Sequence, residues 1–183
     1  MKFFLTVLTA VLIAVLSFII PFFRDKHPFV PNTIFYLAIL VTSLDLIKSK
    51  HKGLVVLINL IHSPLPLIIS IWFGAILYTT TLFHDYHLEL GILMNSILTV
   101  LILSLSLRFQ NLKIAFLMAI PIALMTPICA SFLSSLFPSL MNIGESFEAL
   151  SFSWQILMGI SLAFSLRISN NDNKRKTEKT AKN

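Results

Sequence analysis

Charged residues are scarce in this chain. Asp, Glu, Lys and Arg make up 12% of its 183 residues, whereas 56% are hydrophobic and the mean hydropathy is +0.87. A soluble domain has about 25% charged residues and about 45–50% apolar ones. The polar residues of this chain are too few to cover its apolar surface in water. The composition therefore excludes an ordinary soluble domain and predicts an integral membrane protein, with lipid around most of the chain.

Cysteines and catalytic motifs are missing as well. The single cysteine, Cys129, lies in an apolar run and is interpreted as a small hydrophobe, so no disulfide and no metal cluster is expected. The sequence has no GxGxxG, GxxxxGKS/T or GxSxG motif, which leaves nucleotide binding and α/β-hydrolase chemistry without support. It also lacks paired carboxylates deep within apolar segments for acid–base catalysis. We predict no cofactor, and enzymes are the least favoured class.

Long apolar runs dominate what remains. About 20 helical residues cross the hydrocarbon core of a bilayer. The first run resembles a signal peptide, but it exceeds the usual length and lacks a small-x-small cleavage site, so we interpret it as an uncleaved anchor. Residues 1–169 are predicted to form one transmembrane domain, and the basic tail 170–183 to be disordered because it has almost nothing apolar to bury. The six predicted spans are 3–23, 32–47, 54–83, 90–107, 114–137 and 149–166.

The third run contains a predicted helix break at 62–66. Its sequence there is His62-Ser63-Pro64-Leu65-Pro66, and two prolines in three residues remove backbone donors and clash with the preceding turn. The segment is either one kinked span or a half-helix followed by a full span over 65–83. We favour the second arrangement.

Lysine and arginine predict the orientation. If the N-terminus is cytoplasmic, all of the fourteen basic residues except Arg24 and Lys26 lie on the cytoplasmic side. The fold class is therefore an all-α polytopic bundle of about six spans with both termini in the cytoplasm, in a plasma membrane or bacterial inner membrane. The net charge of +6 follows this topology, so no nucleic-acid partner is predicted. The cluster Lys174-Arg175-Lys176 either attracts anionic lipids or serves only as a topology signal.

A few polar residues lie within or near the predicted spans, where they are functional candidates by default. Helical spacing places Asn59, His62 and Ser63, beside the break, on one helix face. The alternative is that His62 forms a hydrogen bond with a neighbouring helix and that the prolines only shape the bundle. Asp45 lies three residues before Lys48 and either faces the membrane interface or faces the bundle, where it binds a cation or a partner side chain. Asn95 and Gln155 lie on stripes of polar residues, which are also typical of helix packing. The candidate binding residues are Asn59, His62 and Ser63, then Asp45, then Asn95 and Gln155.

An outer loop, His84-Asp85-Tyr86-His87-Leu88-Glu89, offers two histidines three residues apart. Such a pair with neighbouring carboxylates is a weak zinc signal, because no HExxH and no second cluster accompanies it. We interpret the segment as a solvated loop and predict no metal site.

Three functions remain. The first is a non-enzymatic subunit or scaffold of a cell-envelope complex, with membrane lipids and a protein partner or second copy around it. The second is a small-molecule transporter, or its membrane substrate-binding component, with its site at the broken third run and Asn95. The third is an intramembrane metal-dependent enzyme. A dry interior favours the scaffold, and a cavity where Asn59, His62 and Asn95 meet favours transport.

Overall fold

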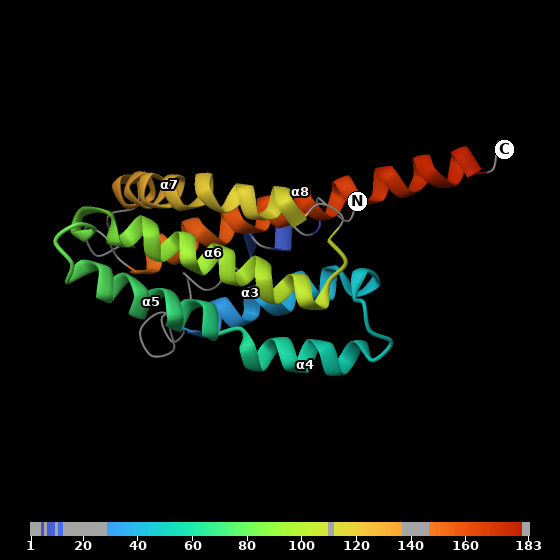
Figure 1. The fold of residues 1–183 in the computed structure, drawn as a ribbon, viewed down its shortest axis with the longest axis horizontal. Helices are drawn as coiled ribbons and strands as arrows, with labels where there is room; N and C mark the ends of the chain where they lie inside the picture. Colours follow the sequence, from blue (N-terminus) through green and yellow to red (C-terminus); the bar gives the residue numbers. More distant parts are fainter. Residues whose placement is uncertain are drawn as a thin grey trace.

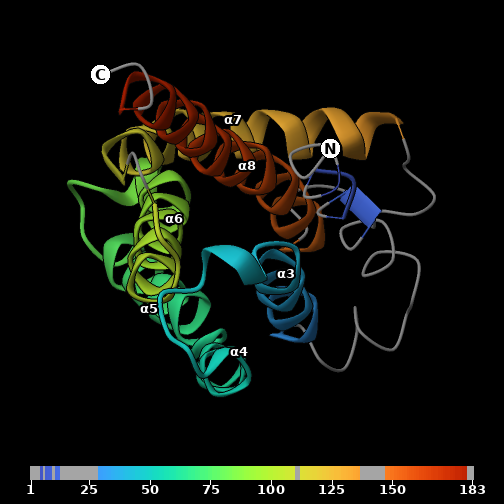
Figure 2. The ribbon, with the colours of Figure 1, turned by 90° about the vertical axis from the view of Figure 1, so that its right-hand side faces the viewer.

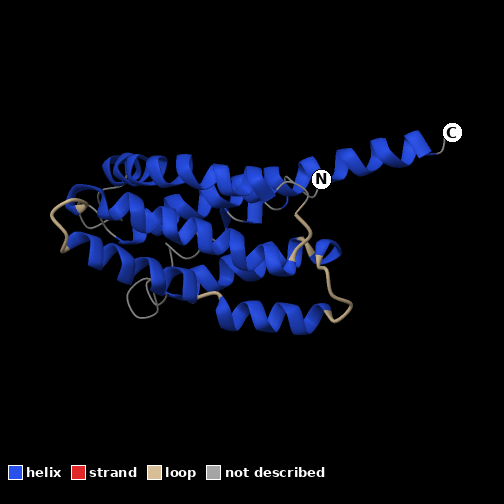
Figure 3. Cartoon of the chain, in the orientation of Figure 1, coloured by secondary structure: helices blue, strands red, loops and turns tan. Residues whose placement is uncertain are grey.

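The regular structure of the described chain is entirely helical. A computed structural model describes residues 5, 7–9, 11, 12, 29–109, 112–136 and 147–180, and the predicted first span, 3–23, falls mostly outside them. Figure 3 shows helices joined by short loops, and no strand in the part described. The elements are α3 (Phe29–Thr42), η1 (Leu44–Leu46), α4 (Lys52–His62), α5 (Leu65–Tyr78), η2 (His84–Tyr86), α6 (His87–Ser106), α7 (Leu112–Leu136) and α8 (Phe147–Thr180).

Three helices are long and apolar enough to cross a membrane. They are Lys52–Tyr78, His84–Ser106 and Leu112–Leu136, which correspond to the third, fourth and fifth predicted runs. Val30–Thr42 and Ala149–Ser165 are shorter apolar helices. The predicted second span, 32–47, is only partly helical, because α3 ends at Thr42 and a short 3-10 turn follows. The 14 residues of α3 cover about 21 Å at 1.5 Å per residue, which is less than the hydrocarbon thickness of a bilayer.

The broken third run is one kinked rod. Ser63 and Pro64 separate α4 from α5, within the predicted break, and both helices continue in the same direction along the bundle (Figure 1). The rod is antiparallel to α6 along its whole length, since Asn59 of α4 bonds to Ser106 near the end of α6 and α5 packs against the start of α6.

This course corrects the favoured sequence interpretation. A full span over 65–83 is not formed, because α5 ends at Tyr78 and its 14 residues reach only about 21 Å. Only α4 and α5 together are long enough to cross. The apolar pattern after Tyr78 includes Leu82 and Phe83, but both are exposed in the turn before η2.

The helices form a ring. α4 packs on α3 and α6, α5 on α6, α6 on α7, α7 on α8, and α8 returns to α3 (Figure 2). The main hydrophobic core lies inside the ring and is centred on Phe35, Tyr36, Ile39 and Leu40 of α3, which are almost fully buried. The Tyr36 hydroxyl donates a 2.8 Å hydrogen bond to Thr99 Oγ1 of α6, so the buried phenol has a partner.

Two loops are joined at the end of the bundle where α4 begins. Lys48 N donates to Ser106 O at 3.0 Å, and Arg108 N donates to Leu46 O at 2.9 Å, on either side of an isolated bridge between residues 47 and 107. These bonds pair residues 46–48 with residues 106–108, so Lys48 and Arg108 lie in adjacent segments.

The basic tail differs from its prediction. The backbone of α8 continues as a helix to Thr180, whereas the sequence predicted a disordered segment over 170–183. Lysine, arginine and glutamate are good helix formers, and adding residues to an existing helix avoids the cost of nucleation. The tail therefore needs no apolar contact of its own to extend α8.

Candidate functional site

The helices α5 and α6 approach each other closely at two glycines, Gly74 and Gly91. A Cβ at Gly91 would lie 3.4 Å from Ser70 O and 3.8 Å from Gly74 Cα, and a Cβ at Gly74 would lie 3.4 Å from His87 O. Small residues at such crossings let helix backbones pack closely in lipid. This contact fixes the position of α5 against α6.

The helix break is stabilised by side chains from α3. The carbonyl oxygen of Ser63 accepts a 3.0 Å hydrogen bond from Asn32 Nδ2. Ser63 Oγ donates toward Leu60 O at 2.8 Å and lies 3.0 Å from Thr33 Oγ1. Backbone groups freed inside a membrane need partners from the protein, because no water is there to supply them. Ser63 is therefore a structural residue of the kink.

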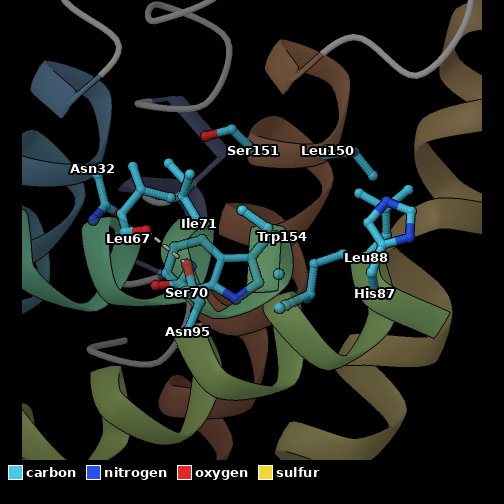
Figure 4. A pocket seen from close by; sticks show the side chains of 14 residues that line it. Asn32, Leu67, Ser70, Ile71, His87, Leu88, Asn95, Leu150, Ser151 and Trp154 are labelled. Atoms are coloured by element: carbon cyan, nitrogen blue, oxygen red, sulfur yellow. Dashed lines mark hydrogen bonds between the residues drawn. The ribbon is translucent and has the colours of Figure 1, made fainter. Parts of the chain in front are cut away.

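A cavity of about 220 Å³ lies between α5, α6 and α8, with Asn32 of α3 at one side. Figure 4 shows Asn32, Ser70 and Asn95 toward one side of the cavity and His87 toward the other. The buried aromatic side chains of α3 fill the ring at other positions, but α3 contributes only Asn32 to the cavity lining. The remaining lining residues are Leu67, Ile71, Gly74, Ala75, Leu88, Gly91, Ile92, Leu150, Ser151 and Trp154.

Asn95 is one of the polar residues that line the cavity, together with Ser151. Its side chain is 6% exposed, it lines the cavity, and its Oδ1 atom accepts no hydrogen bond. Two nearby polar groups are already engaged, since Ser70 Oγ donates to Leu67 O at 2.8 Å and the Asn32 amide donates to Ser63 O. A buried acceptor without a partner is unfavourable by about 1–3 kcal/mol. This oxygen has almost no accessible surface, so it does not open into the cavity although the residue lines it.

Trp154 forms one wall of the cavity. Its indole Nε1 donates a 2.9 Å hydrogen bond to Ser96 Oγ, which in turn donates to Ile92 O at 2.9 Å. Its ring centroid lies 5.6 Å from that of Phe35. Because both the ring and its N–H are held, the wall is rigid and its polar atom is not available to a ligand.

The other predicted binding residues lie elsewhere. Asn59 Nδ2 donates to Ser106 Oγ at 2.7 Å and to Val55 O at 2.8 Å, so Asn59 joins α4 to α6. His62 is exposed and its Nδ1 bonds to Ile58 O at 2.7 Å within α4. The predicted convergence of Asn59, His62 and Asn95 is thus not observed, and only Asn95 lines the cavity.

Asp45 and Gln155 are also away from the cavity. Asp45 is exposed in the 3-10 turn after α3, near the basic loops. Gln155 is completely buried in α8, and neither atom of its amide has a hydrogen-bond partner. A helical spacing of one residue turns Gln155 away from the cavity face that Trp154 occupies.

His84 of η2 and His87, the first residue of α6, form a cluster with Tyr78. The His84 and His87 ring centroids are 6.1 Å apart and lie 4.4 Å and 4.9 Å from the Tyr78 ring. Each Nδ1 bonds to a backbone carbonyl oxygen, of Tyr78 for His84 and of His84 for His87. Across the described ranges, no group of three or more His, Cys, Asp or Glu side chains is arranged to hold a metal ion.

Sequence reasoning missed Asn32 and Trp154 as residues of a site. The predicted span 32–47 begins at Asn32, and an amide within a membrane segment is a signal that could have marked it. Nothing in the local sequence of Trp154 distinguishes a cavity wall from a packing role. Comparison with protein-family models, curated proteins and solved structures gives no match.

The unpartnered amide of Gln155 gives a stability prediction. Gln155→Leu should raise the free energy of unfolding by about 1–2 kcal/mol, because it replaces an unsatisfied buried amide with an apolar side chain of similar size. The measurement is unfolding by SDS titration in mild detergent. Asn59→Leu removes an amide whose Nδ2 donates two hydrogen bonds although its Oδ1 accepts none, so it should lower stability and serves as the control. Destabilisation by Gln155→Leu would contradict the prediction, since it would mean that the amide has a partner.

Proposed function

We propose that this chain is a membrane-embedded binding protein for a small molecule, acting as the substrate-binding component of a transport system. The observation that carries the proposal is the cavity between α5, α6 and α8, whose lining is mostly apolar and includes the polar side chains of Asn95 and Ser151. Ligand sites are typically concave and mostly apolar, with a few polar groups that orient the ligand. The cavity fits that description, whereas a scaffold requires no internal cavity.

The membrane arrangement that we propose is six spans with both termini on the cytoplasmic side of a plasma membrane or bacterial inner membrane. Its support is the distribution of cations. Lys48, Lys50 and Arg108 belong to the two loops that are hydrogen-bonded to each other at one end of the bundle, and Lys52 and Lys113 lie in the first turns of the helices that follow, α4 and α7. Positive residues in short loops favour the cytoplasmic side.

Thiol labelling tests this topology. In a Cys129→Ala background, a cysteine replacing Thr81 should react with a membrane-impermeant maleimide in intact cells, because the turn before η2 is exposed on the side opposite the basic loops. A cysteine replacing Lys50 should react only after the cells are permeabilised. The opposite pattern would invert the proposed orientation, and equal labelling of both sites in intact cells would refute it.

Blocking the cavity tests the binding function. Ala75 is exposed and lines the cavity, so Ala75→Phe should fill part of it without displacing a buried side chain. Ile76→Phe adds an aromatic ring at the next position, which is 59% exposed and does not line the cavity. We expect solvent extracts of the purified wild type and Ile76→Phe to contain a small molecule that is absent from Ala75→Phe, as measured by mass spectrometry.

The same preparation separates the two leading functions. If all three proteins carry the same small molecules, the cavity is not a binding site. A stable co-purified protein in that case would favour the non-enzymatic membrane subunit. A binding component is also expected to have a partner, so a partner protein by itself does not contradict the proposal.

A further inference from the structure

We infer that the exposed face of the kinked rod around His62 is an interface for a transmembrane helix of a different protein, and that this helix places a hydrogen-bond donor opposite His62 near the middle of the bilayer. The inference goes beyond the proposed binding function and is independent of the cavity, which His62 does not line. It depends on the depth of His62 in the membrane, on its hydrogen bonds and on the side chains around it.

His62 lies deep within a helical rod of membrane-spanning length. The rod formed by α4 and α5 runs from Lys52 to Tyr78 and is long and apolar enough to cross a membrane. His62 is the last of the 11 residues of α4, so it lies about 15 Å from Lys52 along the helix, half of a hydrocarbon thickness of about 30 Å. Its side chain is exposed on the surface of the bundle and, unlike a lysine or arginine near a helix end, is too short to reach the headgroups.

One ring nitrogen of His62 has no partner. The other, Nδ1, lies 2.7 Å from the carbonyl oxygen of Ile58. A carbonyl only accepts hydrogen bonds, so Nδ1 carries the hydrogen, and in the neutral ring Nε2 is then an acceptor. Within the described part of the chain, nothing bonds to Nε2. Unsatisfied polar groups are unfavourable in the hydrocarbon region, where ionisable residues face protein or a wet cavity. Because His62 does not line the cavity, Nε2 indicates a protein partner on this surface.

The side chains around His62 form a face suited to helix packing. Ile58 precedes His62 by four residues, and Leu65 and Ile69 follow it by three and seven. All three are exposed, and the two helices of the rod continue in one direction (Figure 1). Spacings of three and four residues place side chains on the face that one helix presents to another. Acyl chains also accommodate such apolar residues, so the unpartnered nitrogen among them is what favours a protein helix over lipid.

A second copy of this chain does not supply the donor from its described residues. In a two-fold pair the two His62 rings would meet at the same depth, and both would present the acceptor Nε2. Outside the rod, the longest exposed apolar face belongs to α7, which begins at the same end of the bundle as α4 (Figure 1). At a comparable distance from its start, the exposed side chains of α7 are Ile120, Pro121, Leu124 and Met125. None of these has a donor, so we expect the donor on a different protein, as a hydroxyl, an amide or a protonated carboxyl group.

Site-specific photo-cross-linking tests the interface. Benzoylphenylalanine is incorporated in place of Ile58, one turn from His62, in the full chain within the cells that naturally produce it. Leu124, on the exposed face of α7, is the matched control position. We expect irradiation to join residue 58, but not residue 124, to a transmembrane segment of a different protein, which mass spectrometry of the adduct identifies. That segment should carry a Ser, Thr, Asn, Gln, Asp or Glu within one turn of the cross-linked residue.

Variants of His62 show whether the adduct depends on the hydrogen bond. His62→Leu should lower the adduct yield about threefold, which corresponds to the loss of one interhelical hydrogen bond in a membrane. His62→Gln, whose Oε1 is also an acceptor, should retain most of the yield. Replacing the partner's donor with alanine should lower the yield as much as His62→Leu does, with no further loss when the two changes are combined.

The stability of the isolated chain provides a second measurement. In mild detergent, His62→Leu should unfold at the same SDS concentration as the wild type, or at a higher one, because His62 bonds to no other helix of the described chain. A loss of stability would assign His62 to the helix break and overturn the inference. It is also overturned by an adduct within the chain or between two copies, by labelling of lipid alone, or by an adduct whose yield is unchanged in His62→Leu.

Discussion

Gly91→Leu is expected to destabilise the protein by about 3 kcal/mol, at the upper end of the cost of overpacking a tight contact. A Cβ at Gly91 already lies 3.4 Å from Ser70 O and 3.8 Å from Gly74 Cα, so the atoms that it meets are backbone atoms that cannot rotate away. A leucine would push α5 from α6 and would also displace Ser70 at the cavity. SDS titration in mild detergent measures the change in stability.

The chain supplies two controls for Gly91. Gly53, in the first turn of α4, has nothing within 4 Å of an added Cβ, so Gly53→Leu should leave stability unchanged or raise it slightly through better helix propensity. Gly91→Ala adds a single carbon at van der Waals distance and should have a small effect. If Gly91→Leu were no worse than Gly53→Leu, α5 and α6 would not be in contact at this position.

Trp154→Ala is expected to cost about 3 kcal/mol, the lower end of the range for deleting a buried aromatic side chain. The indole is 3% exposed, packs 5.6 Å from the Phe35 ring and donates to Ser96 Oγ. Lipid is as apolar as the protein interior, so little of this cost comes from transfer of apolar surface. Lost packing contacts and the enlarged cavity account for most of it.

The other tryptophan is the matched control. Trp72 is 69% exposed, and Trp72→Ala should change stability by less than about 0.5 kcal/mol, as surface substitutions usually do. Trp154→Phe should fall between the two, because it retains a ring beside Phe35 but leaves Ser96 without its donor. Equal effects of Trp72→Ala and Trp154→Ala would contradict the placement of Trp154 in the core.

The bounds of the helices were predicted best where the length of an apolar run alone determines them. The predicted runs 90–107 and 114–137 lie within three residues of α6 and α7 at each end. The prediction did less well where neighbouring elements decide the structure. The end of α3 at Thr42 and the single kinked course of α4 and α5 both depend on contacts with other helices, as in the bond from Asn32 to Ser63.

The same distinction applies to the site. Helical spacing placed Asn59, His62 and Ser63 on one side of a helix, but it does not give the rotation of that helix toward its neighbours. In the structure this side meets α6 and α3 through Asn59 and Ser63, while His62 is exposed. The cavity combines residues from four helices, and of the six predicted binding residues it includes Asn95.

The bond from Asn32 to Ser63 also has a consequence for biosynthesis. Domains are made from the N-terminus onward, so the donor on α3 emerges from the ribosome 31 residues before the carbonyl that it will satisfy. If the helices insert in the order of their synthesis, Asn32 is already in the bilayer when Ser63 enters it. A chain whose α3 was moved downstream of α5 would have to insert the exposed carbonyl first.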